Sequence, residues 1–329
     1  MGGGHLNLSL QDLQREAAAT GFPAETLEKS IRLVSLLNAL RSHPFLKLRV
    51  ALKGGTALNL FVFDLPRLSV DIDLNYIGAP DRDTMVAERP KLEQALQAVC
   101  SREGLAVRSI PGEHAWGKWR LTYAAASGRS GNLELDVNYL LRTPLWPVAP
   151  ADSGAVGSFQ ATRVPLLDLH EIAAGKLAAL LSRNASRDVF DAVELLQRRD
   201  LDREKLRLAF VVYGGFNRKD WRTVSPKDVR VSAPELKSQL LPMLRPDALP
   251  KGKARALVSE CRELLSVVLP LAREEREFIE RLNGSGEIEP AFVTNDRAMQ
   301  KLIRDHPALR WKALSVRKHR GLPVAEEPE

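Results

Sequence analysis

The sequence predicts an α+β (α/β) fold, with a mixed β-sheet in the N-terminal half and a mainly helical C-terminal region. Three observations lead to this prediction. A strand, a turn, a helix and a second strand follow one another between residues 46 and 76. Strand-like segments of the kind that pair antiparallel lie between residues 105 and 140. Beyond residue 157, apolar residues recur at the steps of amphipathic helices.

The N-terminal segment, residues 8–42, predicts two helices. Ser9 and Asp12 have the spacing of a capping box, with aspartate in place of the usual glutamate. Pro23 suits the first turn of the second helix. Apolar side chains recur along that helix at three- and four-residue steps, namely Leu27, Ile31, Val34, Leu37 and Leu40. These side chains are expected to face the core.

Strands and helices are expected to alternate through the next hundred residues. Strand-like patterns occupy residues 46–52, 68–76, 105–110, 118–125 and 133–140. Helices are expected between them at residues 56–63 and 89–102. The first strand ends at a glycine turn that leads directly into the first of these helices.

Residues 144–157 are rich in proline, alanine and glycine, so a domain boundary is expected near residue 150. This divides the chain into residues 1–150, the sheet with its N-terminal helices, and residues 151–329, a mainly helical domain. Helices are expected at 167–182, 186–198 and 202–213, and in several segments from 233 to 282. Residues 316–329 are basic and then acidic, and are expected to be loose.

Length and composition are those of a soluble globular protein. The 329 residues, 44% hydrophobic and 27% charged, can bury a sizeable core. No apolar run approaches the roughly 20 residues that span a bilayer, and the N-terminus lacks a signal-peptide pattern. A cytoplasmic protein without membrane partners is therefore expected. Two cysteines and scattered histidines predict neither a disulfide framework nor a zinc site.

The net charge of +7 and the pI of about 9.5 favour polyanionic partners, nucleic acid first. Basic and aromatic residues gather at 114–120, 218–222 and 312–320. Each cluster by itself is more typical of a solvated face than of a binding site. Together with the charge, the three clusters favour contact with RNA.

Two aspartates share one face of the strand expected over residues 68–76. Because alternate side chains point to opposite faces of a strand, Ser69, Asp71 and Asp73 lie on one face and the apolar residues between them on the other. Mg²⁺ prefers oxygen ligands and commonly uses one or two carboxylates together with substrate phosphates. Taken alone, the pair of aspartates is more often a solvated strand end.

Two further features favour a nucleotide site. The turn Gly54–Thr56 lies between a strand and a helix, where backbone N–H groups can cradle phosphate oxygens; a tight turn that requires positive φ is an equal explanation. On the strand at 133–140, Glu134, Asp136 and Asn138 share one face. A third carboxylate there could complete a metal site or accept the proton of an attacking hydroxyl.

The helical part adds cations and carboxylates at helical spacing. Lys176 and Arg183 are seven residues apart, so they share a helix face and could together meet a triphosphate. Asp188 and Asp191 are neighbours on the next helix. An ordinary surface, with Arg187 and Asp191 as an i,i+4 pair, is the alternative explanation.

The motifs LKGGTALNLF, RLSVDIDLNY, ELDVNY and EIAAGKLAALLSRNASRDVFDAVEL follow one another between residues 52 and 196. The first three resemble the minimal nucleotidyltransferase arrangement of the polymerase-β superfamily. All four in this order resemble the AbiEii/AbiGii toxins, the nucleotidyltransferases of type IV toxin–antitoxin systems, and their mycobacterial MenT relatives. The resemblance implies a polymerase-β-like core with a mixed sheet, followed by a mainly helical domain.

The resemblance also implies roles for individual residues. The implied catalytic residues are Asp71, Asp73, Lys176 and Asp191. The implied nucleotide-binding residues are Lys53, Gly54, Gly55, Thr56, Ser69, Lys176 and Arg183. The implied metal ligands are Asp71, Asp73 and Asp136. Members of the family often carry glutamate or a variable residue at the position of Asp136, which is a departure in this chain.

The implied activity is Mg²⁺-dependent transfer of a nucleotide from an NTP to an acceptor hydroxyl, with Mn²⁺ as an alternative ion. The resemblance implies the 3′ end of tRNA as acceptor, so that transfer blocks translation, and a cognate antitoxin encoded nearby. Two alternatives stay open: transfer to a protein or small molecule, and a non-catalytic module that binds NTP or RNA. Labelled NTPs and a pyrophosphate assay separate these functions.

Overall fold

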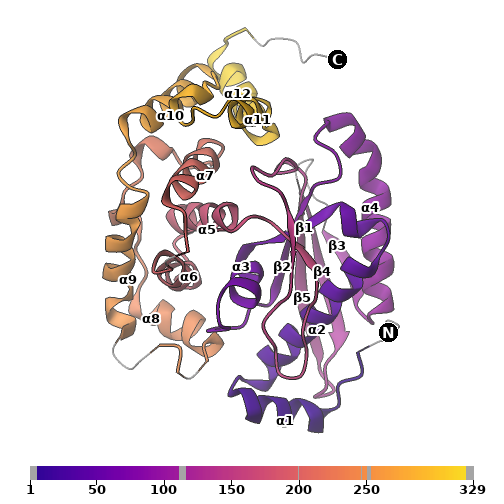
Figure 1. The fold of residues 1–329 in the computed structure, drawn as a ribbon. Coiled ribbons are helices and arrows are strands. Elements are labelled where there is room, and N and C mark those ends of the chain that lie inside the picture. The colour runs from indigo at the N-terminus through magenta and orange to yellow at the C-terminus, as the bar shows by residue number, and fades with distance from the viewer. Residues whose placement is uncertain (1–5, 111–115, 199, 246, 250–252, 324–329) are drawn as a thin grey trace. The chain divides into compact units, whose positions relative to one another are not determined.

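The computed structural model describes residues 6–110, 116–198, 200–245, 247–249 and 253–323. The chain divides into two compact units. Unit 1 consists of Met1–Asp168 and Ala233–Ala254, and unit 2 of Leu169–Ser232 and Arg255–Glu329. Figure 1 shows the sheet in unit 1 and the helices of unit 2. No helix in the described ranges is long and apolar enough to cross a membrane.

The described residues of unit 1 form a seven-stranded mixed sheet with the order β3-β4-β5-β2-β1-β7-β6. Its strands are β1 (Val50–Lys53), β2 (Asp71–Tyr76), β3 (Ala106–Ile110), β4 (Trp116–Ala124), β5 (Ser130–Asn138), β6 (Ala149–Ala151) and β7 (Val164–Leu166). The pairs β2–β5 and β1–β7 are parallel, and the other neighbours are antiparallel. The sheet is therefore mixed, as the sequence predicts.

The principal helices of unit 1 are α1 (Leu10–Thr20), α2 (Ala24–Ser42), α3 (Gly54–Ala57), α4 (Arg82–Arg102) and α8 (Ala233–Glu235). Helices α2 and α4 contact one another and pack on the sheet (Figure 1). The five apolar residues predicted to line the core side of α2 are all buried. Helix α3 continues as one π-helical turn over Leu58–Val62.

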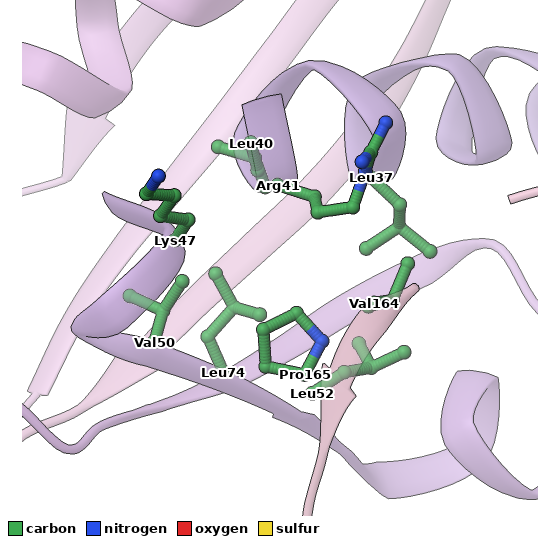
Figure 2. A pocket seen from close by; sticks show the side chains of 9 residues that line it. All are labelled: Leu37, Leu40, Arg41, Lys47, Val50, Leu52, Leu74, Val164 and Pro165. Carbon is green, nitrogen blue, oxygen red and sulfur yellow. The ribbon is translucent and has the colours of Figure 1, made fainter. Parts of the chain in front are cut away.

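The apolar face of the sheet is closely packed beneath α2. A pocket of only about 10 Å³ remains there, roughly the room of one water molecule. Figure 2 shows the side chains that line it: Leu37, Leu40, Arg41, Lys47, Val50, Leu52, Leu74, Val164 and Pro165. Because alternate strand residues point the other way, this packing leaves the polar residues of β1, β2, β4 and β5 on the opposite face.

Unit 2 is helical in its described part. Its helices are α5 (Leu169–Arg183), α6 (Ser186–Leu196), α7 (Arg203–Gly215), most of α9 (Lys253–Leu264), α10 (Arg273–Ser285), α11 (Arg297–Asp305) and α12 (Pro307–Arg320). Helix α5 packs against α6 and α7, and α10 against α7 and α12. Phe210, Trp221 and Phe278 fill the core, and an ion pair of 2.6 Å between Arg207 and Glu275 joins α7 to α10.

Two predicted segment ends are wrong for local reasons. Residues 46–48 form a 3₁₀ turn, so the strand begins only at Val50. The His43 ring nitrogen Nδ1 accepts hydrogen bonds from the following amides and holds the chain in a turn there. Helix α4 begins at Arg82 rather than at residue 89, because Asp81 caps it by accepting from the amides of Asp83 and Thr84.

The C-terminal segment predicted to be loose is helical as far as Arg320 in α12, which Gly321 ends in a left-handed conformation. The segment near residue 150, expected as a boundary, contains the short strand β6, and β7 follows it. Both strands belong to the sheet, and the first part of unit 1 extends to Asp168. Proline-rich edge strands of three residues resemble linkers in sequence.

Candidate active site

A row of four charged residues crosses the polar face of the sheet. The strand register places Lys118 of β4 opposite Asp136 of β5, Asp136 opposite Asp73 of β2, and Asp73 opposite Lys53 of β1. Residues directly opposite one another on neighbouring strands project from the same face. Two carboxylates thus stand between two ammonium groups. All four residues line a pocket of about 270 Å³.

A second row lies beside the first, towards the start of β2. Here Asp71 is opposite Glu134, which in turn is opposite Arg120. Lys118 Nζ lies 2.6 Å from Glu134 Oε2, and this hydrogen bond is the main reason that the pKa of Lys118 is raised. The nearby Asp136 and Asp71 raise it further. Lys118 therefore remains a cation beside the carboxylates.

Asp136 is the carboxylate with the most perturbed surroundings in the pocket. Burial raises its pKa, and the negative charges of Asp73 and Glu134 add to this, against the opposing effect of Lys118 and Lys53. Its Oδ1 atom is buried and accepts no hydrogen bond from the described residues. An unsatisfied buried carboxylate oxygen is unfavourable unless a cation or donor binds it.

The oxygen atoms of Asp71, Asp73 and Asp136 suit a hard divalent cation. Across the part of the chain that the structure describes, no three His, Cys, Asp or Glu side chains form a ready-made metal cluster. Mg²⁺ does not need one, because it is commonly bound by one or two carboxylates together with substrate phosphates. With the unpaired Oδ1 of Asp136, the donor set fits an ion that binds together with a triphosphate.

Gly54 is the first residue of α3 and brings that helix against the Asp73 carboxylate. Its φ of +75° is a left-handed conformation that suits glycine. A Cβ atom at this position would lie 2.1 Å from Asp73 Oδ2. Within the described residues, the cap residue Lys53 makes no side-chain hydrogen bond to the helix start. The turn therefore presents its first amides close to a carboxylate of the row.

Thr56 and Ser69 fasten α3 to the beginning of β2. Both side chains are buried. The Thr56 hydroxyl donates to the carbonyl oxygen of Asp71, and its oxygen lies 2.9 Å from the Ser69 hydroxyl. Ser30 of α2 donates to the Ser69 carbonyl oxygen at 3.0 Å. These contacts position the backbone beside the aspartates, while a direct nucleotide contact of either hydroxyl stays a prediction.

Gly54→Ala is expected to displace the Asp73 carboxylate and to reduce nucleotide transfer by about a hundredfold or more, the scale of one misplaced catalytic group. The left-handed conformation adds roughly 1–2 kcal/mol of strain. Transfer rates and urea unfolding measure the two effects. Gly128→Ala is the matched control, because Gly128 has a φ of +78° and a methyl group there would meet no atom within 4 Å. Equal losses of transfer in both variants would contradict the steric explanation.

In unit 2, Lys176 lies between two buried aspartates. Its Nζ atom is 2.9 Å from Asp188 Oδ1 and 2.8 Å from Asp191 Oδ2. Arg183 Nε is 2.6 Å from Asp188 Oδ2. Burial works against ionisation of Asp188, but Lys176 and Arg183 outweigh it, so the pKa of Asp188 is lowered. This cluster is held together within the helices α5 and α6.

The structure brings the predicted site residues together in two groups, each within its own unit. Unit 1 gathers Lys53, Gly54, Gly55, Thr56, Ser69, Asp71, Asp73 and Asp136 around the start of α3 and the polar sheet face. Unit 2 joins Lys176, Arg183 and Asp191, and adds Asp188 as the residue that both cations contact. The predicted functions of these residues stay predictions.

Sequence reasoning missed the position of Lys118. The sequence placed this lysine in the basic and aromatic cluster at 114–120, which was expected to be a solvated face rather than a binding site, whereas Lys118 lines the pocket and Trp119 is buried on the other side of β4. His114 of that cluster lies outside the described residues. The signal was present, because pairing β4 with β5 through the turn at Gly128 places Lys118 opposite Asp136.

Comparisons with known proteins concern the family and the fold of the chain. The family model of the AbiEii nucleotidyl transferase toxin of type IV toxin–antitoxin systems matches residues 35–315. The structure resembles MenT4, a nucleotidyltransferase toxin from Mycobacterium tuberculosis H37Rv, with a TM-score of 0.61 and 18% identity over 92% of this chain and 99% of that one.

A candidate nucleotidyltransferase from H. pylori has a TM-score of 0.47 and 16% identity, over 79% of this chain and 99% of that one. No curated protein sequence matches the chain. The MenT4 likeness concerns the fold, whereas the family model covers well over half of the residues. The chain therefore belongs to the AbiEii family of nucleotidyltransferase toxins of type IV toxin–antitoxin systems.

Proposed function

We propose that this toxin transfers a nucleoside monophosphate from an NTP to the 3′-terminal hydroxyl of tRNA, with Mg²⁺ or Mn²⁺, and thereby blocks translation in the cytoplasm. The supporting observation is the row Lys118–Asp136–Asp73–Lys53 beside the glycine that begins α3. Carboxylates suit a divalent ion and the flanking cations suit phosphates. As in other type IV systems, a cognate antitoxin would neutralise the toxin.

The residues of unit 1 have separate roles in the proposed transfer. Asp71 and Asp73 would hold the metal ion, which supplies charge neutralisation at the α-phosphate when bound. Lys53 and the amides of Gly55 and Thr56 are suited to hold the β- and γ-phosphates, which leave as pyrophosphate. These contacts orient the α-phosphate for in-line attack by the acceptor hydroxyl.

Asp136 has two roles open to it, as a third metal ligand or as the proton acceptor. Its raised pKa supports the second role, because a more basic carboxylate accepts the proton of the attacking hydroxyl more readily. The bond from the acceptor hydroxyl oxygen to the α-phosphorus forms as the bond from the α-phosphorus to the pyrophosphate oxygen breaks. Lys118, held by Glu134, limits the repulsion between the carboxylates.

For unit 2, we propose that Lys176 acts as a phosphate-binding cation and that Asp191 orients its side chain. The support is the resemblance of the segment EIAAGKLAALLSRNASRDVFDAVEL, in which both residues lie, to AbiEii sequences, together with the ion pair of 2.8 Å between them. Arg183, the other predicted phosphate ligand, contacts Asp188 and so stabilises the same cluster.

The decisive experiment is a panel of the four α-labelled NTPs with purified total tRNA and Mg²⁺. We expect label on tRNA together with pyrophosphate release, and none on tRNA whose 3′ end has been oxidised with periodate. Chelation should stop the reaction, and Mg²⁺ or Mn²⁺ should restore it. Label confined to protein would contradict the tRNA acceptor. Nucleotide binding without pyrophosphate release would instead identify a non-catalytic module.

A further inference from the structure

The excess positive charge of the chain is concentrated in one short segment. Residues 297–320, which form α11 and α12, hold 8 of the 48 Lys and Arg residues and 1 of the 41 Asp and Glu residues. The other 305 residues, including the three glutamates near the C-terminus, are balanced at 40 basic and 40 acidic. The net charge of +7 therefore equals the charge of this helical hairpin.

Helix α11 carries its cations on one face. Arg297, Lys301 and Arg304 follow one another at steps of four and three residues, and all three are exposed. On the other side of the helix, Ile303 is fully buried. Arg304 approaches Glu289 at 3.8 Å, a solvent-exposed ion pair that contributes little. This face is thus basic and largely uncompensated.

Helix α12, which contacts α11 (Figure 1), has a similar face with an aromatic residue in it. Arg310, Trp311, Arg317 and Lys318 lie at helical spacing on one side, while Leu309 and Ala313 are buried on the other. Trp311 is 49% exposed and is the one aromatic among the strongly exposed large apolar side chains of the described residues.

Most basic residues of the hairpin do not hold the fold together through ion pairs. Within the described ranges, Arg297, Lys301, Arg310, Arg317, Lys318 and Arg320 form no ion pair with a carboxylate of this chain. Lys312, by contrast, points inward and donates to the Asn217 carbonyl oxygen at 3.1 Å. The structural contribution of the hairpin therefore comes from its buried side, and the basic faces are available to a partner.

We propose that the α11–α12 hairpin binds RNA that contains unpaired nucleotides, with its cations on the phosphates and Trp311 stacked on a base. Charge complementarity requires a polyanion. An exposed tryptophan flanked by cations favours a partner with flat π-faces, which single-stranded nucleic acid has and an acidic protein segment lacks. This proposal rests on the proposed function only where it identifies the RNA as tRNA.

In the test, the full chain is titrated into a fluorescein-labelled 12-nucleotide single-stranded RNA without NTP. The fluorescence anisotropy of the RNA gives the affinity at each of a series of salt concentrations. Arg310→Gln/Arg317→Gln/Lys318→Gln should weaken binding about tenfold or more and reduce the slope of log affinity against log salt by about 2, since each lost phosphate contact removes about 0.7. Arg297→Gln/Lys301→Gln/Arg304→Gln should act in the same direction. Circular dichroism checks that each variant is folded.

Trp311→Ala should weaken binding about 5- to 100-fold with the salt slope unchanged, because stacking releases no counterions. Trp311→Phe should restore part of the loss. The matched control is Arg15→Gln/Arg82→Gln/Arg129→Gln, three exposed arginines of unit 1 with the same change in charge. An equal loss in this control would overturn the proposal, because net charge alone would then explain binding.

Two further outcomes separate this proposal from others. If polyglutamate competes with the RNA, and Trp311→Ala does not change the binding of polyglutamate, the surface fits an acidic protein and the RNA proposal fails. If RNA binding depends on the hairpin but label from NTP goes only to protein, the tRNA transferase proposal fails while the RNA surface stands. If the hairpin variants transfer nucleotide to tRNA with an unaltered KM for tRNA, the proposal of an RNA-binding surface fails while the transferase proposal stands.

Discussion

Asp71→Ala is expected to abolish nucleotide transfer and toxicity while the chain stays folded. Asp71 is half-buried at the start of β2 and faces the pocket side of the sheet, opposite Glu134. Loss of one charged group at a site of developing phosphate charge costs roughly 10²–10³-fold in rate, and loss of a metal ligand adds to this. The hydrogen bond from Thr56 uses the Asp71 backbone oxygen, so it survives the substitution.

Transfer of label to tRNA and growth on expression measure this effect, and a thermal unfolding curve close to that of the parent chain shows that the fold is retained. Asp83→Ala is the matched control, because Asp83 is an exposed aspartate in the same unit and lies away from the pocket. An Asp71→Ala variant that still labelled tRNA at the parent rate would show that the aspartate pair is not the catalytic centre.

Lys176→Met is expected to lower the free energy of unfolding by about 3–5 kcal/mol, the usual cost of removing one partner from a buried ion pair. Lys176 neutralises Asp188 and Asp191, which are 1% and 0% exposed. Nucleotide transfer should be lost as well. The double variant Lys176→Met/Asp191→Asn removes a charge of each sign, so we expect it to regain part of the stability without regaining transfer.

The stability difference between Lys176→Met and the parent chain should depend on pH. In the parent chain, the effect of burial on Asp188 is outweighed by Lys176 and Arg183, so the pKa of Asp188 is lowered. Removal of Lys176 raises this pKa, because burial then meets less opposition. The stability difference is therefore smallest below the lowered pKa of Asp188 in the parent chain, grows as pH rises from that pKa to the higher pKa of the variant, and is constant above it. Urea unfolding between pH 3 and 7 measures it, and a pH-independent difference would contradict the electrostatic explanation.

Local patterns in the sequence predicted the elements of the site well. Strand alternation placed Asp71 and Asp73 on one face and Glu134 with Asp136 on another strand face, and the structure has both arrangements. The glycine turn at Gly54 was also predicted from a local signal, because glycine readily adopts the positive φ that this turn requires. Where local signals competed, as in the turn after His43 and the cap at Asp81, the predicted ends shifted by several residues.

These local patterns could not predict which strands pair when they are distant in the sequence. Asp73 and Asp136 become neighbours only through the parallel pairing of β2 with β5. The pairing of β4 with β5 could be inferred from the turn at Gly128, but its position beside β2 could not. The strand β7 lies beside β1 although more than a hundred residues separate them in the chain. Such pairings depend on the packing of whole elements, which the periodicity of one segment does not contain.

By itself, the sequence determined the family motifs, the two aspartates on one strand face and the placement of the net charge in residues 297–320, because these are properties of composition and local periodicity. Only the tertiary structure decided that two lysines enclose two aspartates in one row, and that Lys176 is shared by two buried carboxylates. The physical reason is that electrostatic neighbours are set by strand register and helix packing, which bring distant residues within a few ångströms of one another.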